Sequence, residues 1–293
     1  MRRSSDSSQT LVLGAVAYDP KVLAIWEGFG RVFAARGLGL DFVLYSNYER
    51  LVEALFDGAV DVAWNSPLAW IETDRLARAR GRTASAVAMR DTDRDLTSVI
   101  LVRAHDPIAS LADLQGRIVA VGAADSPQAT LIPLLALSEA GLAPGRDFEV
   151  ARHDVLLGKH GDHIGGERDA VRALLANRVD AACILDASLL TFGQEGTLCA
   201  GATQILHQTP PYDHCNFTVL DGGPDELVDR FTTLLLEMRY DDPAVRPLME
   251  QEGLTAWRPG RTVGYALIAR AADRLGTIDA WLARMGAPPM RQG

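Results

Sequence analysis

Short apolar runs alternate with stretches of helical periodicity from one end of the chain to the other. In the first third, three apolar runs end in turn residues, which predicts strands over 10–17, 40–46 and 60–66. Between the first two, apolar side chains recur at three- and four-residue spacing and predict a helix over 20–36: Val22, Ile25, Trp26, Phe29 and Phe33. A second helix is expected over 48–56. This alternation predicts parallel sheets covered by helices.

The same pattern restarts near residue 96. Apolar runs predict strands over 96–104, 116–122, 147–153 and 179–185, with helices over 127–140 and 167–178. Residues 202–220 are extended, contain Pro210-Pro211 and are interpreted as a return crossing. Two helical stretches, 223–238 and 262–285, complete the chain.

Two features favour a division into two similar halves. A chain of 293 residues exceeds the usual size of a single hydrophobic core. The segments 51–66 and 171–186 also share the layout of a helix, a Val-Asp pair and a strand. We therefore expect a first lobe formed by residues 10–95 and 206–293, a second lobe over 96–205, and a disordered tail over 1–9.

Charge and hydropathy exclude two classes of partner. The formal net charge of −9 would repel the phosphates of a nucleic acid, so no nucleic-acid partner is expected. A local cluster of backbone amides can still bind a small anion in a protein of this charge. The sequence contains no run of about 18 apolar residues, so no membrane insertion is expected.

Cysteine usage and the first apolar run bear on the compartment. Cys183, Cys199 and Cys215 form no CxxC pair and leave an odd thiol, which is typical of a reducing environment. The apolar run from Leu11 to Ala17 is interpreted as the first strand rather than as part of a signal peptide. These observations predict a cytoplasmic protein, with the periplasm as the alternative.

Four stretches of the chain resemble a known family. They are "SNYERLVEALFDGAVDVAWNSPLAWIE", "SVILVRAHDPIASLADLQGRIVAVG", "GERDAVRALLANRVDAACILD" and "LHQTPPYDHCNFTVL". Together they resemble the type 2 periplasmic binding proteins, in particular the phosphate- and phosphonate-binding subfamily of ABC importers. The resemblance implies a two-lobed α/β fold with two mixed sheets flanked by helices. It also implies that a small ligand is held in the cleft between the lobes, and that an ABC permease is a partner.

The resemblance assigns ligand contacts to the turns that follow the strands. Tyr48 matches the family's aromatic residue, and Ser126 matches the first hydroxyl of a Ser-Thr-Ser turn that grips an anion. The next two positions are Pro127 and Gln128, so two of the three hydroxyls are missing. Glu167 stands where the family has a histidine, and Cys215, preceded by His214, stands where the family has an acidic residue. The resemblance implies that the ligand is an anion of phosphate, phosphonate or carboxylate type. The substitutions remove hydrogen bonds to such an anion, so they leave the individual compound unspecified.

Polar residues at the ends of the predicted strands extend this set. In open α/β sheets, ligands bind outside the carboxyl ends of the strands. The expected ligand-binding residues are Tyr18, Asp19, Tyr48, Asn65, Ser66, Ser126, Gln128, Glu167, Asp186, Tyr212, His214 and Cys215.

Two alternatives stay open. The Gly-rich segment around His160 and His163 could bind a divalent metal, although no cofactor is required by the pattern. The fold also hosts enzymes, so a lyase, a decarboxylase or an enzyme of cofactor biosynthesis is the alternative to a solute-binding protein. In that case Glu167, His214 and Cys215 are the candidate catalytic residues.

Overall fold

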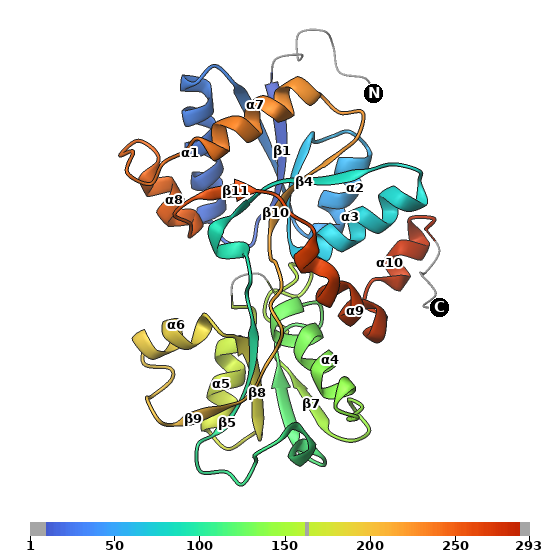
Figure 1. The fold of residues 1–293 in the computed structure, drawn as a ribbon, viewed down its shortest axis with the longest axis vertical. Helices are drawn as coiled ribbons and strands as arrows, with labels where there is room; N and C mark the ends of the chain where they lie inside the picture. Colours follow the sequence, from blue (N-terminus) through green and yellow to red (C-terminus); the bar gives the residue numbers. More distant parts are fainter. Residues whose placement is uncertain (1–9, 162–163, 288–293) are drawn as a thin grey trace. The chain divides into compact units, whose positions relative to one another are not determined.

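The computed structural model describes residues 10–161 and 164–287, and the chain forms two compact units (Figure 1). Of the described residues, the first unit contains 10–94, His214–Val263 and 281–287. The second contains 95–161, 164–213 and Gly264–Ala280. The tail expected over residues 1–9 lies outside the described residues.

The first unit is built on a six-stranded mixed sheet in the order β11-β4-β10-β3-β1-β2. Strands β1, β2 and β3 are parallel, whereas β10 is antiparallel to both β3 and β4. The strand bounds are β1 Thr10–Val16, β2 Gly39–Tyr45, β3 Val62–Asn65, β4 Ala84–Arg90, β10 Asn216–Leu220 and β11 Trp257–Pro259. The helices are α1 Lys21–Ala35, α2 Tyr48–Phe56, α3 Pro67–Ala79, η2 Asp91–Asp93, α7 Asp225–Leu236 and α8 Arg246–Glu252.

The second unit has a five-stranded mixed sheet in the order β7-β6-β8-β5-β9. Strand β6 is parallel to β7 and β8, and β5 is antiparallel to β8 and β9. The strand bounds are β5 Ser98–Arg103, β6 Ile118–Val121, β7 Glu149–Arg152, β8 Ala181–Leu185 and β9 Thr203–Gln208. The helices are η3 Leu111–Leu114, η4 Pro127–Leu131, α4 Ile132–Glu139, α5 Glu167–Leu175, α6 Ser188–Gln194 and α9 Ala266–Leu275, with η5 Val263–Tyr265 and α10 Asp279–Arg284 where the chain passes between the units. Two mixed sheets flanked by helices confirm the expected fold class.

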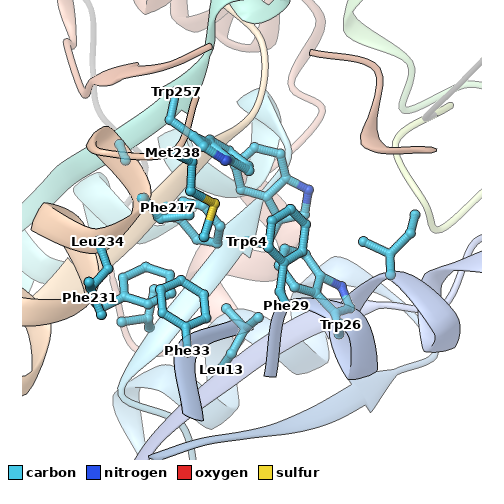
Figure 2. Packing of buried hydrophobic residues seen from close by; sticks show 14 of the residues in the cluster. Leu13, Trp26, Phe29, Phe33, Trp64, Phe217, Phe231, Leu234, Met238 and Trp257 are labelled. Atoms are coloured by element: carbon cyan, nitrogen blue, oxygen red, sulfur yellow. The ribbon is translucent and has the colours of Figure 1, made fainter. Parts of the chain in front are cut away.

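An aromatic cluster fixes α1 and α7 on one face of the first sheet (Figure 2). The rings of Trp64 and Phe217, from neighbouring strands β3 and β10, have centroids 4.5 Å apart. Trp257 packs against Phe217 at 5.3 Å, and Trp26 of α1 packs edge-on against it at 6.0 Å. Aromatic pairs of this kind add about 0.5–1.5 kcal/mol each to the burial of their area. The cluster therefore holds β3 and β10 rigidly where their polar ends project.

The boundaries of the units differ from the expected lobes in two places. The first unit ends at Arg94 and resumes at His214, so β9 and the segment after it belong to the second unit. Residues Gly264–Ala280, expected in the first lobe, also belong to the second unit. The reason is that α9 packs its apolar face against α4 and η4, with Ile268 fully buried.

Other local expectations also changed. The helix expected over 262–285 is interrupted at Gly276, which adopts a left-handed conformation with φ of 65°.

Among the residues that the structure describes, no helix is long and apolar enough to cross a lipid bilayer.

Candidate functional site

The topology brings several expected ligand residues to one edge of the first sheet. The parallel strands β1, β2 and β3 end at this edge, and the next residues are Tyr18 and Asp19, then Tyr48, then Ser66. Because β10 is antiparallel to β3, with Asn216 paired to Asn65, β10 begins where β3 ends. His214 and Cys215, which precede β10, therefore lie at the same edge as Asn65.

Local hydrogen bonds position most of the turns at this edge. Asp19 accepts the amide of Lys21 at 2.8 Å, and Ser66 Oγ caps α3 by accepting the amide of Ala69 at 3.1 Å. Tyr48 is buried as the first residue of α2, next to Asn47, whose side chain caps that helix. Asn47 and Ser66 thus serve as helix caps, and Asp19 bonds the first amide of α1, which fixes the loops that carry them.

Asn65 has a hydrogen-bonding capacity that its own unit does not use. Its Nδ2 donates to Thr73 Oγ1 at 3.2 Å. Its Oδ1 is buried and has no hydrogen-bond partner among the described residues. A buried amide oxygen without a partner is costly, so Asn65 is the residue at this edge best suited to accept a hydrogen bond from a ligand.

A buried ionic cluster lies behind the same edge. Arg90 forms a two-pronged ion pair with Asp93, with N–O distances of 2.6 and 2.7 Å, and donates to the backbone carbonyl of Glu252 at 2.8 Å. Burial alone would raise the pKa of Asp93. The charge and hydrogen bonds of Arg90, together with His214, outweigh burial and hold the pKa of Asp93 well below its usual range.

His214 and Cys215 join this cluster. His214 Nδ1 lies 3.1 Å from Cys215 Sγ and 3.5 Å from Asp93 Oδ1, and the His214 amide donates to the carbonyl of Asp93 at 2.8 Å. Successive side chains of an extended segment normally point to opposite sides. Here the two side chains converge.

In the second unit, Ser126 and Gln128 lie where β6 leads into η4. Ser126 Oγ accepts the amide of Ala129 at 3.2 Å and caps this helix, with Pro127 as its first residue. Gln128 Nε2 donates to the carbonyl of Gly161 at 2.7 Å. Gln128 is buried, and its Oε1 has no hydrogen-bond partner among the described residues. Gln128 Oε1 in the second unit thus resembles Asn65 Oδ1 in the first unit, since both are buried acceptors with no partner among the described residues.

Tyr212 holds the crossing segments of the second unit together. Its backbone pairs with Leu96, with both N–O distances at 2.8 Å, and its hydroxyl lies 2.8 Å from Ser98 Oγ. Ser98 donates its only hydroxyl hydrogen to the carbonyl of Gln128 at 2.6 Å, so Tyr212 is the donor to Ser98. Burial raises the pKa of Tyr212, which keeps this donor protonated.

Two carboxylates from the expected set have internal partners. Glu167, at the start of α5, accepts the Leu185 amide at 3.0 Å and the Ser188 hydroxyl at 2.7 Å. Asp186 accepts the hydroxyl of Thr97 at 2.6 Å. Both therefore tie the end of β8 to neighbouring segments, and this is the role that their geometry supports.

Of the expected metal ligands, His163 lies outside the described residues. His160 is buried in a left-handed conformation with φ of 53°, and its amide donates to Asp125 at 3.3 Å. Burial lowers the pKa of His160 to about 3, so its ring is neutral at ordinary pH.

Sequence reasoning missed Arg90, Asp93 and Ser98. The motif around Asp93, "RDTDRD", reads as an ordinary solvated run of charges. The one feature of the sequence that could have indicated a role for this motif is its position next to the predicted boundary between the lobes, at residues 95 and 96.

Comparison with known proteins places these features in context. The chain is 30% identical over 225 residues to the tetrathionate sensor histidine kinase TtrS of Salmonella typhimurium. This match covers 72% of the present chain but only 36% of that relative. A methylphosphonate complex of PhnD1 from Prochlorococcus marinus superimposes with a TM-score of 0.68, at 15% identity, over 92% of this chain and all of the other. A protein from Xanthomonas citri bound to ATP gives a TM-score of 0.69, at 18% identity, over 92% and 98%.

The family comparison decides between the expected compartments. Residues 18–265 match the model of the family described as "ABC transporter, phosphonate, periplasmic substrate-binding protein". Because this family is periplasmic, the expectation of a cytoplasmic protein is wrong. The error came from interpreting three cysteines and a short apolar run as indicators of compartment. The match also supports the solute-binding interpretation over the enzyme alternative. The chain belongs to the phosphonate-type family of periplasmic substrate-binding proteins.

Proposed function

We propose that this protein binds a small solute that ends in a tetrahedral oxyanion, such as a phosphonate, a phosphate ester or a sulfur oxyanion. The ligands named for the similar proteins share this group: methylphosphonate, ATP and tetrathionate each end in a phosphorus or sulfur atom bearing several oxygens. The observation that carries the proposal in this chain is the buried turn of Ser126 and Gln128 at the start of a helix.

A helix start suits an oxyanion because its first amides point outward and its dipole is positive there. Here Pro127 has no amide hydrogen and the Ala129 amide donates to Ser126 Oγ, so the Ser126 hydroxyl and the Gln128 amide are the donors that this helix start offers. Gln128 Oε1 can only accept a hydrogen bond, as can Asn65 Oδ1 in the first unit. We therefore expect ligands that also carry a donor, such as a protonated phosphonate oxygen or an amino group, to bind better than a fully deprotonated sulfonate of similar size.

An ABC permease is the proposed partner, because the family consists of substrate-binding proteins of ABC transporters. The relationship to a tetrathionate sensor kinase favours a second candidate, in which the same fold reports ligand binding to a signalling partner. The two candidates predict different ligands, since the first favours phosphonates and the second favours tetrathionate.

Isothermal titration of the purified protein tests the proposal. The ligand panel contains methylphosphonate, an aminoalkylphosphonate, an alkanesulfonate of equal length, tetrathionate and acetate. At least one oxyanion should bind, and Ser126→Ala should weaken it about 10- to 150-fold, as expected for a lost hydrogen bond to a charged group. Gln128→Ala should weaken the aminoalkylphosphonate, which carries a donor, more than methylphosphonate.

Ser110→Ala provides the matched control, because Ser110 caps the exposed helix η3 of the same unit. Its effect on affinity should be negligible. Absence of binding by every oxyanion, or equal effects of Ser110→Ala and Ser126→Ala, would overturn the proposal.

A further inference from the structure

The cluster of Asp93, His214 and Cys215 has the composition of a transition-metal site. Its three donor atoms, a carboxylate oxygen, an imidazole nitrogen and a thiol sulfur, all lie within 4.8 Å of one another. These are the ligand types that zinc binds in proteins. Asp93 was not expected to act with His214 and Cys215, since it lies 121 positions before His214 in the chain.

The distances between donor atoms fit a tetrahedral cation. Zinc bonds of about 2.0–2.3 Å at tetrahedral angles place neighbouring ligand atoms about 3.3–3.5 Å apart. In the cluster, the imidazole nitrogen is 3.1 Å from the sulfur and 3.5 Å from the carboxylate oxygen. Both distances from the imidazole nitrogen therefore lie close to the tetrahedral values, and the sulfur and the carboxylate oxygen lie within 4.8 Å of each other.

The surroundings hold these ligands in place. Asp93 and Cys215 are 1% and 2% exposed, and His214 is 8% exposed. Arg90 orients the Asp93 carboxylate by donating to both of its oxygens, and the backbone carbonyl of Glu252 accepts from Arg90 in turn. Hydrogen-bonded partners behind the direct ligands are a regular feature of metal sites.

The charges of the cluster also favour a cation. Arg90 contributes one positive charge, and Asp93 and Glu252 contribute two negative charges, all of them buried. A metal-bound Cys215 would be a thiolate and add a third negative charge. The four side chains then carry a net charge of −2 despite the positive charge of Arg90, and a divalent cation neutralises it.

We propose that Asp93, His214 and Cys215 form a binding site for a thiophilic divalent cation, with Zn²⁺ as the first candidate. Three protein ligands leave a fourth position for a water molecule or another small ligand. The site is distinct from the turn of Ser126 and Gln128, and cation binding is measured without any solute, so its test is independent of the proposed function.

Cobalt provides the direct test, because a thiolate bound to Co²⁺ gives a charge-transfer band in the near ultraviolet. The full chain, stripped with a chelator, should bind one equivalent of Co²⁺ with this band and with visible bands of tetrahedral intensity. Zn²⁺ should then displace the cobalt and abolish both. Cys215→Ser should remove the charge-transfer band, and His214→Ala should weaken binding more than about tenfold, the least expected for a direct ligand.

Cys199→Ser, at an exposed free thiol, and Cys183→Ser, at a buried thiol of the second unit, are the matched controls and should leave the band unchanged. His160→Ala tests the competing histidine and should also leave it unchanged. The proposal is overturned if the wild-type protein binds no Co²⁺, binds it without a thiolate band, or retains the band in Cys215→Ser. The first two outcomes need no variant, so they decide the matter even if a variant fails to fold.

Discussion

Arg90 and Asp93 form an ion pair through two guanidinium nitrogens, at 2.6 and 2.7 Å, with both side chains buried in the first unit. The guanidinium also lies 5.3 Å from the ring of Trp64 in the aromatic cluster. One side chain thus connects the hydrophobic core to the polar edge of the sheet.

Arg90→Ala should therefore destabilise the protein by about 3–5 kcal/mol, because it leaves the carboxylates of Asp93 and Glu252 buried without their cation. Urea unfolding followed by circular dichroism measures this change. Arg239→Ala is the control, since Arg239 pairs with Asp241 at 3.1 Å on the surface and should cost less than about 1 kcal/mol. Equal losses of unfolding free energy in the two variants would show that the buried ion pair contributes no more to stability than the surface pair.

Tyr212 and Ser98 should be energetically coupled. Tyr212→Phe removes the donor to Ser98 and should cost about 1–2 kcal/mol, and Ser98→Ala should cost a similar amount because it also releases the Gln128 carbonyl. In a double-mutant cycle the pair should show a coupling energy of about 0.5 kcal/mol or more. Strictly additive losses would contradict the hydrogen bond between them.

Glu167 should prove structural. Glu167→Ala leaves the Leu185 amide and the Ser188 hydroxyl without their acceptor and should lower stability by about 2–3 kcal/mol. The affinity for the solute, measured at a temperature where the variant is fully folded, should change less than about threefold. Asp169→Ala, on the same helix and exposed, is the control for stability. A large loss of affinity with unchanged stability would instead make Glu167 a ligand contact or a catalytic group.

His160 should make the protein less stable in mild acid. Its pKa is lowered to about 3 in the folded protein, below the usual value of 6.5, so the unfolded chain binds a proton that the folded chain does not. The contribution of the neutral ring is complete above pH 6.5 and is lost as the pH falls from there toward 3. The slope from this residue is at most about 1.4 kcal/mol per pH unit.

His160→Gln should flatten the stability profile between pH 6.5 and 4, as measured by thermal or urea unfolding at several pH values. His105→Gln, which replaces an exposed histidine, is the control. An unchanged slope in His160→Gln would show that the imidazole is not kept neutral by burial.

The sequence predicted the elements that hydrophobic periodicity specifies. The strand over 10–17, the helix over 20–36 with Trp26 and Phe29 inward, and the two mixed sheets all follow from local pattern and resemblance. It could not predict α9 as part of the second unit, because packing against α4 depends on a contact between segments far apart in the chain. The same limit applies to Asp93 and His214, whose meeting is set by β10 entering the first sheet.

The side-chain roles were harder to predict than the elements. Ser126 and Gln128 were expected from the resemblance, and the structure places them together at the start of η4. Whether a polar residue caps a helix, as Ser66 does, or keeps an unused acceptor, as Asn65 does, depends on distances of a few tenths of an ångström. The convergence of His214 and Cys215 runs against strand alternation, so no pattern in the sequence indicates it.

The insertion of β10 between β3 and β4 has a consequence for synthesis of the protein on the ribosome. Phe217, Phe231 and Trp257 all come from chain that follows residue 213, yet they complete the core around β3. The amino-terminal strands of the first sheet are therefore synthesised before β10. Their hydrophobic core can be completed only after about 120 further residues have been made. We expect the segment that was made earliest to be among the last to become protected from proteolysis.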